Sequence, residues 1–285
     1  MFFSGIADEA ATSIERQVEA HRALGWRHIE LRLIDGTNVV DLDDSAFDRV
    51  ADRVRSAGLE VSCFAARLAN WGRPIDTDFA VDRDELVRNI PRMQRLGTRF
   101  IRCMSYPNAK PPLPVAEWRK RVVDRMRELA KIAEDGGVVL VHENCDGWGG
   151  LGPRETMELL AEVDSPALKL VFDTGNPVAH RQDAWEYYPG VRDEIVYVHI
   201  KDYRRGDDGK EVACYAGEGE GRVRDIISDL LERGYDGGFS IEPHITSVVH
   251  LAQAADDPEL AYATYVEYGK RLMALVESIR SELKR

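Results

Sequence analysis

The stretch EDGGVVLVHE, residues 134–143, contains the structural unit from which most of this chain is built. Gly136 and Gly137 end a segment with helical spacing of apolar residues, and the valine-rich run that follows closes on Glu143. A glycine just past a helix can adopt the left-handed cap conformation, and a short apolar run of β-branched residues is typical of a buried strand. The stretch therefore predicts a helix, a turn and a buried strand that ends in a carboxylate.

The same succession recurs in ALGWRHIELRL at 23–33, SAGLEVSCFA at 56–65, RLGTRFIRCM at 95–104 and ERGYDGGFSIE at 232–242. Strands that alternate with helices through short turns form parallel sheets, and eight such units close into a barrel. We expect strands at 2–6, 28–33, 59–64, 98–104, 138–143, 168–173, 195–199 and 239–242. We expect helices at 13–24, 45–57, 84–96, 115–135, 154–163, 223–233 and within 261–283. The predicted fold is one α/β domain, a single (β/α)8 TIM barrel over residues 1–285.

Loop length is uneven between the two ends of the predicted barrel. The turns from helix to strand are short, whereas connections that leave the carboxyl ends of strands are long at 65–81, 105–114, 144–153, 203–222 and 243–258. Active sites of such barrels lie at the carboxyl ends of the strands. We therefore expect the functional site at this loop-rich end.

Composition and charge favour a small-molecule partner. The chain carries a formal charge of −12 and no concentrated basic patch, so a nucleic-acid partner is not expected. No apolar stretch approaches the roughly 18 residues needed to cross a bilayer, and the start MFFSGIADEA lacks the pattern of a signal peptide. We expect no membrane association and a cytoplasmic location.

Strands five to eight each end in a residue that can bind a divalent cation: Glu143, Asp173, His199 and Glu242. Taken singly, each can be explained as a helix cap or a turn residue. Together, three carboxylates at one end of a barrel would repel one another strongly without a cation. The set predicts one divalent metal ion. Oxygen ligands with one imidazole and no thiolate favour Mn²⁺ first, with Mg²⁺ or Co²⁺ as alternatives.

The surrounding motifs resemble those of a known family. HEN at 142–144, FDTGNP at 172–177, HIKD at 199–202, GEGEGR at 217–222 and SIEPH at 240–244 are similar to the xylose-isomerase-like sugar and sugar-phosphate epimerase and isomerase barrels. The resemblance spans essentially the whole chain, with its specific motifs in the second half. It implies that the four residues bind one metal ion, that the two glutamates act as acid and base on the two faces of a sugar substrate, and that the chain can form homo-oligomers.

Two candidate substrate contacts follow from the same resemblance. Arg205 follows His199 by six positions, where the ketose epimerases have an arginine, although an arginine in RRGDDGK can also be a solvated loop charge. Asn176 stands where those enzymes often carry a histidine, three residues after the metal-binding aspartate. An amide can hydrogen-bond a sugar hydroxyl but cannot shuttle a proton, so this position leaves the substrate open.

Three further contacts are expected at the same end of the barrel. Lys201 lies two residues beyond His199 and can face the substrate or pair with Asp202. Arg102, like Arg32 and Arg67 near the ends of neighbouring strands, is a candidate anion contact or a partner of barrel-rim acids. Trp148 can wall a sugar pocket or simply pack within its loop. The GEGEGR glycines lack the lysine of a phosphate loop and are better explained as a flexible lid or a turn before the helix at Val223.

The predicted activity is metal-dependent isomerisation or epimerisation of a sugar or sugar phosphate through a metal-stabilised enediolate. In this scheme Glu143 removes a proton next to a carbonyl and Glu242 returns one. An inosose-dehydratase-like lyase is the nearest alternative. A non-catalytic sugar-binding barrel and an endonuclease IV-like nuclease are more distant ones, the latter because most of the histidines of its three-metal site are missing.

Overall fold

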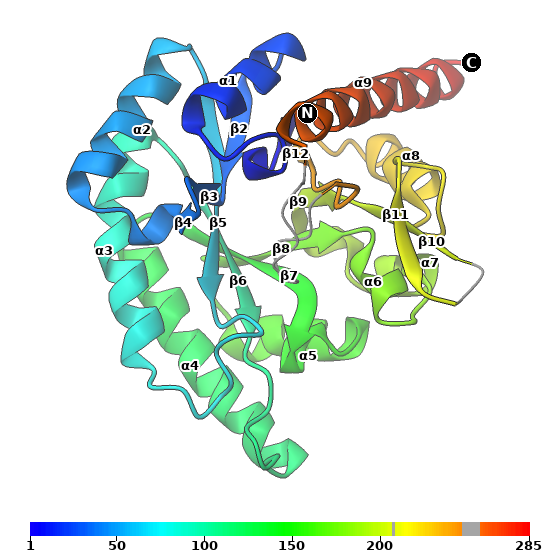
Figure 1. Ribbon diagram of the computed structural model, residues 1–285. Coiled ribbons are helices and arrows are strands. Elements are labelled where there is room, and N and C mark those ends of the chain that lie inside the picture. Colours follow the sequence, from blue (N-terminus) through cyan, green and yellow to red (C-terminus); the bar gives the residue numbers. More distant parts are fainter. Residues whose placement is uncertain (207–208, 247–256) are drawn as a thin grey trace.

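In the computed structural model, which describes residues 1–206, 209–246 and 257–285, eight parallel strands form one sheet (Figure 1). The sheet order is β1-β12-β9-β8-β7-β6-β5-β2, and a parallel bridge between Ile6 and Glu30 joins the two ends. The predicted (β/α)8 barrel is confirmed. The strands are β1 (Phe2–Gly5), β2 (His28–Leu31), β5 (Glu60–Leu68), β6 (Phe100–Ser105), β7 (Val139–Gly147), β8 (Leu168–Asp173), β9 (Ile195–Ile200) and β12 (Gly238–Ile241).

Helices separate the strands and cover the outside of the barrel (Figure 1). The longer ones are α1 (Ile14–Ala23), α2 (Asp44–Ser56), α3 (Ala80–Leu96), α4 (Val115–Asp135), α5 (Pro153–Val163), α8 (Val223–Glu232) and α9 (Pro258–Leu283). At the five recurring junctions, a glycine adopts positive φ as the helix-to-strand turn requires: Gly25, Gly58, Gly97, Gly137 and Gly234. The predicted repeat therefore has its physical basis in left-handed turns that only glycine adopts without strain.

The barrel interior is packed directly beneath the expected site. Alternation along a strand places the residue two positions before each predicted ligand on the same inward face. These residues are Val141, Val171, Tyr197 and Ser240, and all are buried. The first three belong to an apolar cluster inside the barrel, as is usual for this architecture. The predicted ligands therefore lie directly above a packed barrel interior.

Several boundaries differ from the expected ones. Strands β5 and β7 run four residues further than predicted, to Leu68 and Gly147, because their ends continue to pair with neighbouring strands across register shifts. The expected loop after residue 203 contains a hairpin, β10 (Asp202–Arg205) with β11 (Glu211–Cys214), and a second small hairpin joins β3 (Leu33–Ile34) to β4 (Thr37–Asn38). Two short helices without a predicted counterpart, α6 (Asn176–Ala179) and α7 (Ala184–Tyr187), follow β8. The expected loop at 243–258 lies partly outside the described residues.

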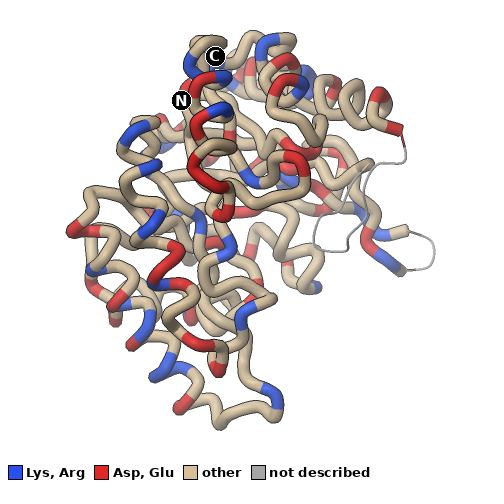
Figure 2. The backbone as a smooth tube through the Cα atoms, turned by 60° about the vertical axis from the view of Figure 1, so that its left-hand side comes forward, with Lys and Arg blue, Asp and Glu red and all other residues tan. Residues whose placement is uncertain are grey.

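The charged residues are mixed over the described chain. Figure 2 shows Lys and Arg positions interspersed with Asp and Glu positions along the outer helices. Among the described helices, none is both long and apolar enough to cross a membrane.

Burial of His21 makes the stability of the fold depend on pH. His21 lies on α1 with no exposed surface, its Nδ1 2.9 Å from the Gln17 carbonyl oxygen and its Nε2 3.2 Å from the hydroxyl of Tyr265 on α9. Burial lowers the pKa of His21 to about 4. Between that value and about 6.5, the unfolded chain takes up a proton that the native protein does not. The free energy of unfolding is therefore highest above about pH 6.5 as far as His21 is concerned. It falls as the pH drops below this value, because protonation of His21 then stabilises the unfolded chain.

We expect acidification from pH 7 to pH 4.5 to cost the wild type about 2–3 kcal/mol more than the His21→Gln variant in free energy of unfolding. Urea denaturation at the two pH values measures this difference. The exposed His180 provides the control, since His180→Gln should behave like the wild type. Equal pH dependence in the wild type and in His21→Gln would contradict the assignment.

Candidate functional site

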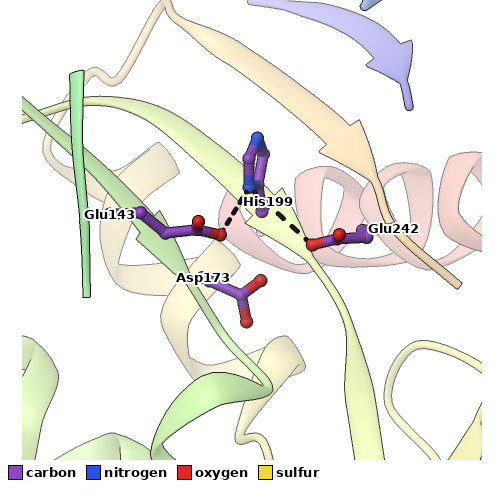
Figure 3. Close-up of side chains that lie close together, drawn as sticks. All are labelled: Glu143, Asp173, His199 and Glu242. Carbon is purple, nitrogen blue, oxygen red and sulfur yellow. Dashed lines mark hydrogen bonds and ion pairs between the residues drawn. The ribbon is translucent and has the colours of Figure 1, made fainter. Parts of the chain in front are cut away.

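The four predicted ligands, Glu143, Asp173, His199 and Glu242, lie together at the carboxyl end of the barrel. Each offers one oxygen or nitrogen atom, and these atoms all lie within 4.8 Å of one another. Figure 3 shows the carboxylates of Glu143 and Glu242 approaching His199 from different sides, with Asp173 beside them. No member is more than 3% exposed. Residues up to 99 positions apart in sequence are thus brought to one point because β7, β8, β9 and β12 are consecutive in the barrel.

The imidazole of His199 is held on both of its nitrogens. Nδ1 lies 3.0 Å from Glu143 Oε1 and 4.0 Å from Glu242 Oε2, whereas Nε2 lies 3.1 Å from Glu30 Oε1 on the far side. Burial by itself would lower the pKa of His199, but the charge of Glu30 and the bond to Glu143 outweigh it and raise that pKa to about 10. These two carboxylates thus favour the protonated ring over the neutral one.

The two oxygens of Asp173 have different roles. Oδ1 accepts hydrogen bonds from the backbone N–H groups of Gly175 at 2.8 Å and Asn176 at 2.7 Å, which fixes the carboxylate at the start of α6. Oδ2 forms an ion pair with Lys201 Nζ at 2.9 Å but accepts no hydrogen bond from the described residues. Burial raises the pKa of Asp173 to about 6 although Lys201 opposes the shift. One oxygen is structural, and the other remains available to a ligand.

Paired hydrogen bonds between side chains and the backbone join the strand ends that carry the predicted ligands. Asn144 donates to the Asp173 carbonyl at 3.0 Å and accepts from the Asp173 N–H at 2.7 Å, which joins β7 to β8. Thr174 Oγ1 donates to the Lys201 carbonyl at 2.6 Å and accepts from the Lys201 N–H at 3.1 Å, which joins β8 to the end of β9. The HEN and FDTGNP motifs thus supply the ligands together with the residues that position them.

Glu242 is the most heavily partnered of the four. Oε1 accepts a hydrogen bond from Arg32 Nη1 at 2.7 Å and lies 3.2 Å from His244 Nε2, and Oε2 lies 3.2 Å from Lys201 Nζ. Burial would raise the pKa of Glu242, but Lys201, His244 and Arg32 outweigh it and hold this pKa well below its usual range. Glu143 is kept ionised in the same way. Burial opposes ionisation, but Arg102 and His199 lower the pKa of Glu143 to about 2.

The donor set fits a divalent cation. Buried carboxylates outnumber buried fixed cations here, with Asp8, Glu9, Glu30, Glu143, Asp173 and Glu242 against Arg32, Arg102 and Lys201. Asp173 Oδ2, left without a hydrogen bond, lies beside two further carboxylates and an imidazole nitrogen. Hard divalent ions take such oxygen-rich sets, and an ion bound by His199 would replace the ring proton on Nδ1.

A cavity of about 290 Å³ opens above the ligand set. Glu143 and Glu242 line it, together with three of the five predicted substrate contacts, Arg102, Asn176 and Lys201. Arg102 also forms an ion pair with Glu143 at 3.5 Å. At the mouth lie the half-exposed Arg67 and Trp71. The size is close to the lower end of the range for small-molecule sites, roughly 300–1,000 Å³.

The structure places the other two predicted contacts elsewhere. Arg205 lies on β10 with its side chain half exposed, 3.6 Å from Glu220, and does not line the cavity. Trp148 is 3% exposed in a 3-10 helix, Trp148–Gly150, with the Arg119 guanidinium 5.3 Å from its ring centroid. It belongs to the barrel–helix core. In this structure Arg205 is therefore an exposed charge and Trp148 a packing residue, and neither lines the cavity.

Two further local expectations are decided by the fold. Lys201 pairs with Asp173 and Glu242 rather than with Asp202. The carboxylate of Asp202 instead accepts hydrogen bonds from the backbone N–H groups of three glycines in the GEGEGR motif, Gly217, Gly219 and Gly221, at 2.8–2.9 Å. The glycine-rich segment is therefore a turn organised by an internal anion, as the sequence indicates.

Two residues contact the predicted ligands in a way that was not expected from the sequence. Arg32, expected as an anion contact, lines the cavity but is already bound by Asp8, Glu9 and Glu242. Glu30, which bonds His199, was not singled out. A charged residue inside the apolar run HIELRL was the available signal, because a buried charge requires a specific partner.

We expect Arg32→Met to lower the free energy of unfolding by about 3–5 kcal/mol, because three buried carboxylates lose their shared partner. Urea denaturation in metal-free buffer measures the loss. Arg205→Met is the matched control and should change stability by no more than about 0.5 kcal/mol, because its ion pair is exposed. A loss below about 1 kcal/mol for Arg32→Met would contradict the role given to this guanidinium.

Comparisons with known proteins identify relatives of this chain. The family described as xylose isomerase-like TIM barrel matches residues 18–271. The chain is 26% identical over 125 residues to fructoselysine 3-epimerase of Escherichia coli O157:H7, covering 43% of this chain and 44% of that protein. It is 30% identical over 166 residues to inosose dehydratase of Bacillus thuringiensis (strain Al Hakam), covering 53% and 52%. The match thus spans about half or less of each of these relatives.

Among solved structures, a xylose isomerase-like TIM barrel protein from Mycobacterium smegmatis in complex with magnesium superposes with a TM-score of 0.69 at 20% sequence identity, over 92% of this chain and 89% of that one. This likeness concerns the fold. Because the family match extends over most of its length, the chain belongs to the xylose isomerase-like TIM barrel family.

Proposed function

We propose that this protein is a divalent-metal-dependent isomerase that epimerises or isomerises a sugar or sugar phosphate. The observation that carries the proposal is a pair of buried glutamates, Glu143 and Glu242, which share one ligand set with Asp173 and His199 at the floor of a cavity. The epimerase among the relatives supports the same reaction class.

The four residues would hold one ion, with Mn²⁺ as the first choice and Mg²⁺ or Co²⁺ as alternatives. The magnesium complex of the Mycobacterium smegmatis relative supports a divalent ion without deciding which one this protein uses. When bound, the ion supplies a Lewis acid that stabilises the enediolate charge developing on a hydroxy-carbonyl substrate.

The surroundings of the two glutamates suit them to proton transfer. Glu143 is ionised beside Arg102 and can accept the proton removed from the carbon next to the carbonyl. Glu242 is ionised in the ion-free protein, so it must first take up the proton that it is proposed to return. Lys201 and His244, each 3.2 Å from its carboxylate, are the adjoining groups that can pass a proton to it. Return to the opposite face of the same carbon gives an epimer, and delivery to the neighbouring carbon gives an aldose–ketose pair.

Cavity residues would orient the substrate. Asn176 and Lys201 present polar groups beside the glutamates and can bind hydroxyl or carbonyl oxygens. Arg102 is held by Glu143 and by the Ala66 carbonyl, which makes it a fixed donor rather than a mobile one. The cavity has both polar and aromatic lining, in keeping with a small carbohydrate.

A lyase is the second candidate, because inosose dehydratase is among the relatives. The same proton removal followed by departure of a hydroxyl from the next carbon would release water. A panel of ketoses, ketose phosphates and inososes incubated with Mn²⁺, with products identified by NMR and mass spectrometry, separates the two. An isobaric product supports the isomerase, and a product lighter by one water supports the lyase.

We expect Glu242→Gln to reduce solvent deuterium incorporation into the substrate by about 10²–10⁴-fold, because an amide cannot return the proton. The measurement is mass spectrometry of substrate turned over in D₂O. Glu85→Gln serves as the control, since Glu85 is equally buried but pairs with Arg73 away from the cavity. Undiminished exchange in a folded Glu242→Gln protein would reject the role of Glu242.

Metal analysis tests the ligand set independently of turnover. We expect the purified chain, reconstituted with Mn²⁺, to hold one ion, and Asp173→Asn to weaken binding because it removes the charge of the available oxygen. Asp82→Asn, at another fully buried aspartate outside the cavity, should keep wild-type affinity. Substoichiometric binding by the reconstituted wild type would count against the proposed enzyme and favour a non-catalytic sugar-binding barrel.

A further inference from the structure

Glu30 is a charged side chain in the interior of the barrel. It lies on β2, has no exposed surface, and pairs in register with Cys63 of β5. Side chains of barrel interiors are mostly branched and apolar, as the neighbouring Val141 and Val171 are. A carboxylate in this layer therefore requires an explanation in its contacts.

Three donors converge on the Glu30 carboxylate. Oε2 accepts hydrogen bonds from the hydroxyls of Tyr197 at 3.0 Å and Ser240 at 2.6 Å. Oε1 lies 3.1 Å from His199 Nε2. The two hydroxyls come from strands β9 and β12, so they fix one oxygen and leave the other directed at the imidazole.

This arrangement determines which nitrogen of His199 faces the site. An ionised carboxylate only accepts hydrogen bonds, so the hydrogen of a neutral His199 ring would lie on Nε2. The lone pair would then be on Nδ1, the nitrogen that lies 3.0 Å from Glu143 and belongs to the ligand set. Histidines that bind metals commonly donate their second N–H to a carboxylate, which orients the ring and strengthens its basicity.

We propose that Glu30 is a positioning residue for the metal site, which holds His199 as the Nε2–H tautomer with Nδ1 directed at the ion. The proposal rests on the proposed function, because it assumes that the four-residue set binds a divalent ion. It assigns no contact with substrate to Glu30. The polar layer of Tyr197 and Ser240 beneath the ligands is explained as the support of this carboxylate.

The competing explanation is purely structural. Glu30 also bridges to Ile6 through the backbone, where β2 meets β1, and its side chain could serve only to close the barrel at that seam. A structural role predicts a loss of stability without a specific change in metal affinity. A positioning role predicts weaker binding by a protein that remains folded.

The first test is the Mn²⁺ affinity of Glu30→Gln, measured by electron paramagnetic resonance titration of folded protein, with circular dichroism as the check of folding. We expect a Kd about 10–100-fold higher than that of the wild type. Tyr197→Phe keeps the charge of Glu30 but frees its carboxylate to turn away from His199, and should raise the Kd by a smaller factor. Glu85→Gln, a buried glutamate bound to Arg73 instead, should leave the Kd unchanged.

A second readout follows the ring itself. In NMR spectra of the Mg²⁺-loaded wild type, His199 should show a protonated Nε2 and an unprotonated Nδ1. In Glu30→Gln the Nε2–H resonance should move upfield, because an amide oxygen accepts a weaker hydrogen bond than a carboxylate. Wild-type Kd values and an unchanged Nε2–H resonance in both folded variants would overturn the proposal. If Glu30→Gln does not fold, Tyr197→Phe decides by the same two measurements. Absence of binding by the wild type would instead refute the proposed function, so the two failures are distinguishable.

Discussion

Negative charge gathered out of water at the carboxyl ends of the strands is the constraint on which the rest of the structure depends. Glu143, Asp173 and Glu242 are buried within one cluster, and ionised carboxylates in such surroundings need cations or donors close by. Arg32 and Lys201 supply such compensation for Glu242. A divalent ion would complete the compensation in the proposed enzyme, where the same charges would hold it.

The local motifs are best understood as supports for this cluster. Thr174 and Asn144 tie together the strand ends on either side of Asp173, and Asp202 draws three glycine N–H groups into a turn beside Lys201. Below the ligands, Glu30 anchors the histidine. Residues between and beneath the ligands thus restrict where the charged atoms can be, which is what precise proton transfer requires.

Much of the fold could be predicted because its signals are local. The glycine turns and the apolar runs depend on neighbours within a few residues, and the barrel follows from their repetition. Glu242 and the other candidate ligands could be singled out because each ends such a run. Arg205 was proposed from the family resemblance, and Trp148 because it is an aromatic residue in a long loop. The structure placed Arg205 on an outward-facing hairpin and Trp148 in the core, because loop paths depend on packing that no periodic pattern records.

The sequence by itself determined the order of strands and helices, the end of the barrel that carries the site and the four candidate ligands. Only the tertiary structure decided which charges meet. Arg32 and Glu242 are 210 positions apart, and His199 and Glu30 are 169 apart. Contacts of that separation arise when the barrel closes and brings its second strand near its seventh and eighth. The partners of each buried charge are therefore set only when the barrel closes. Each candidate ligand, in contrast, can be located from the sequence of the single strand that carries it.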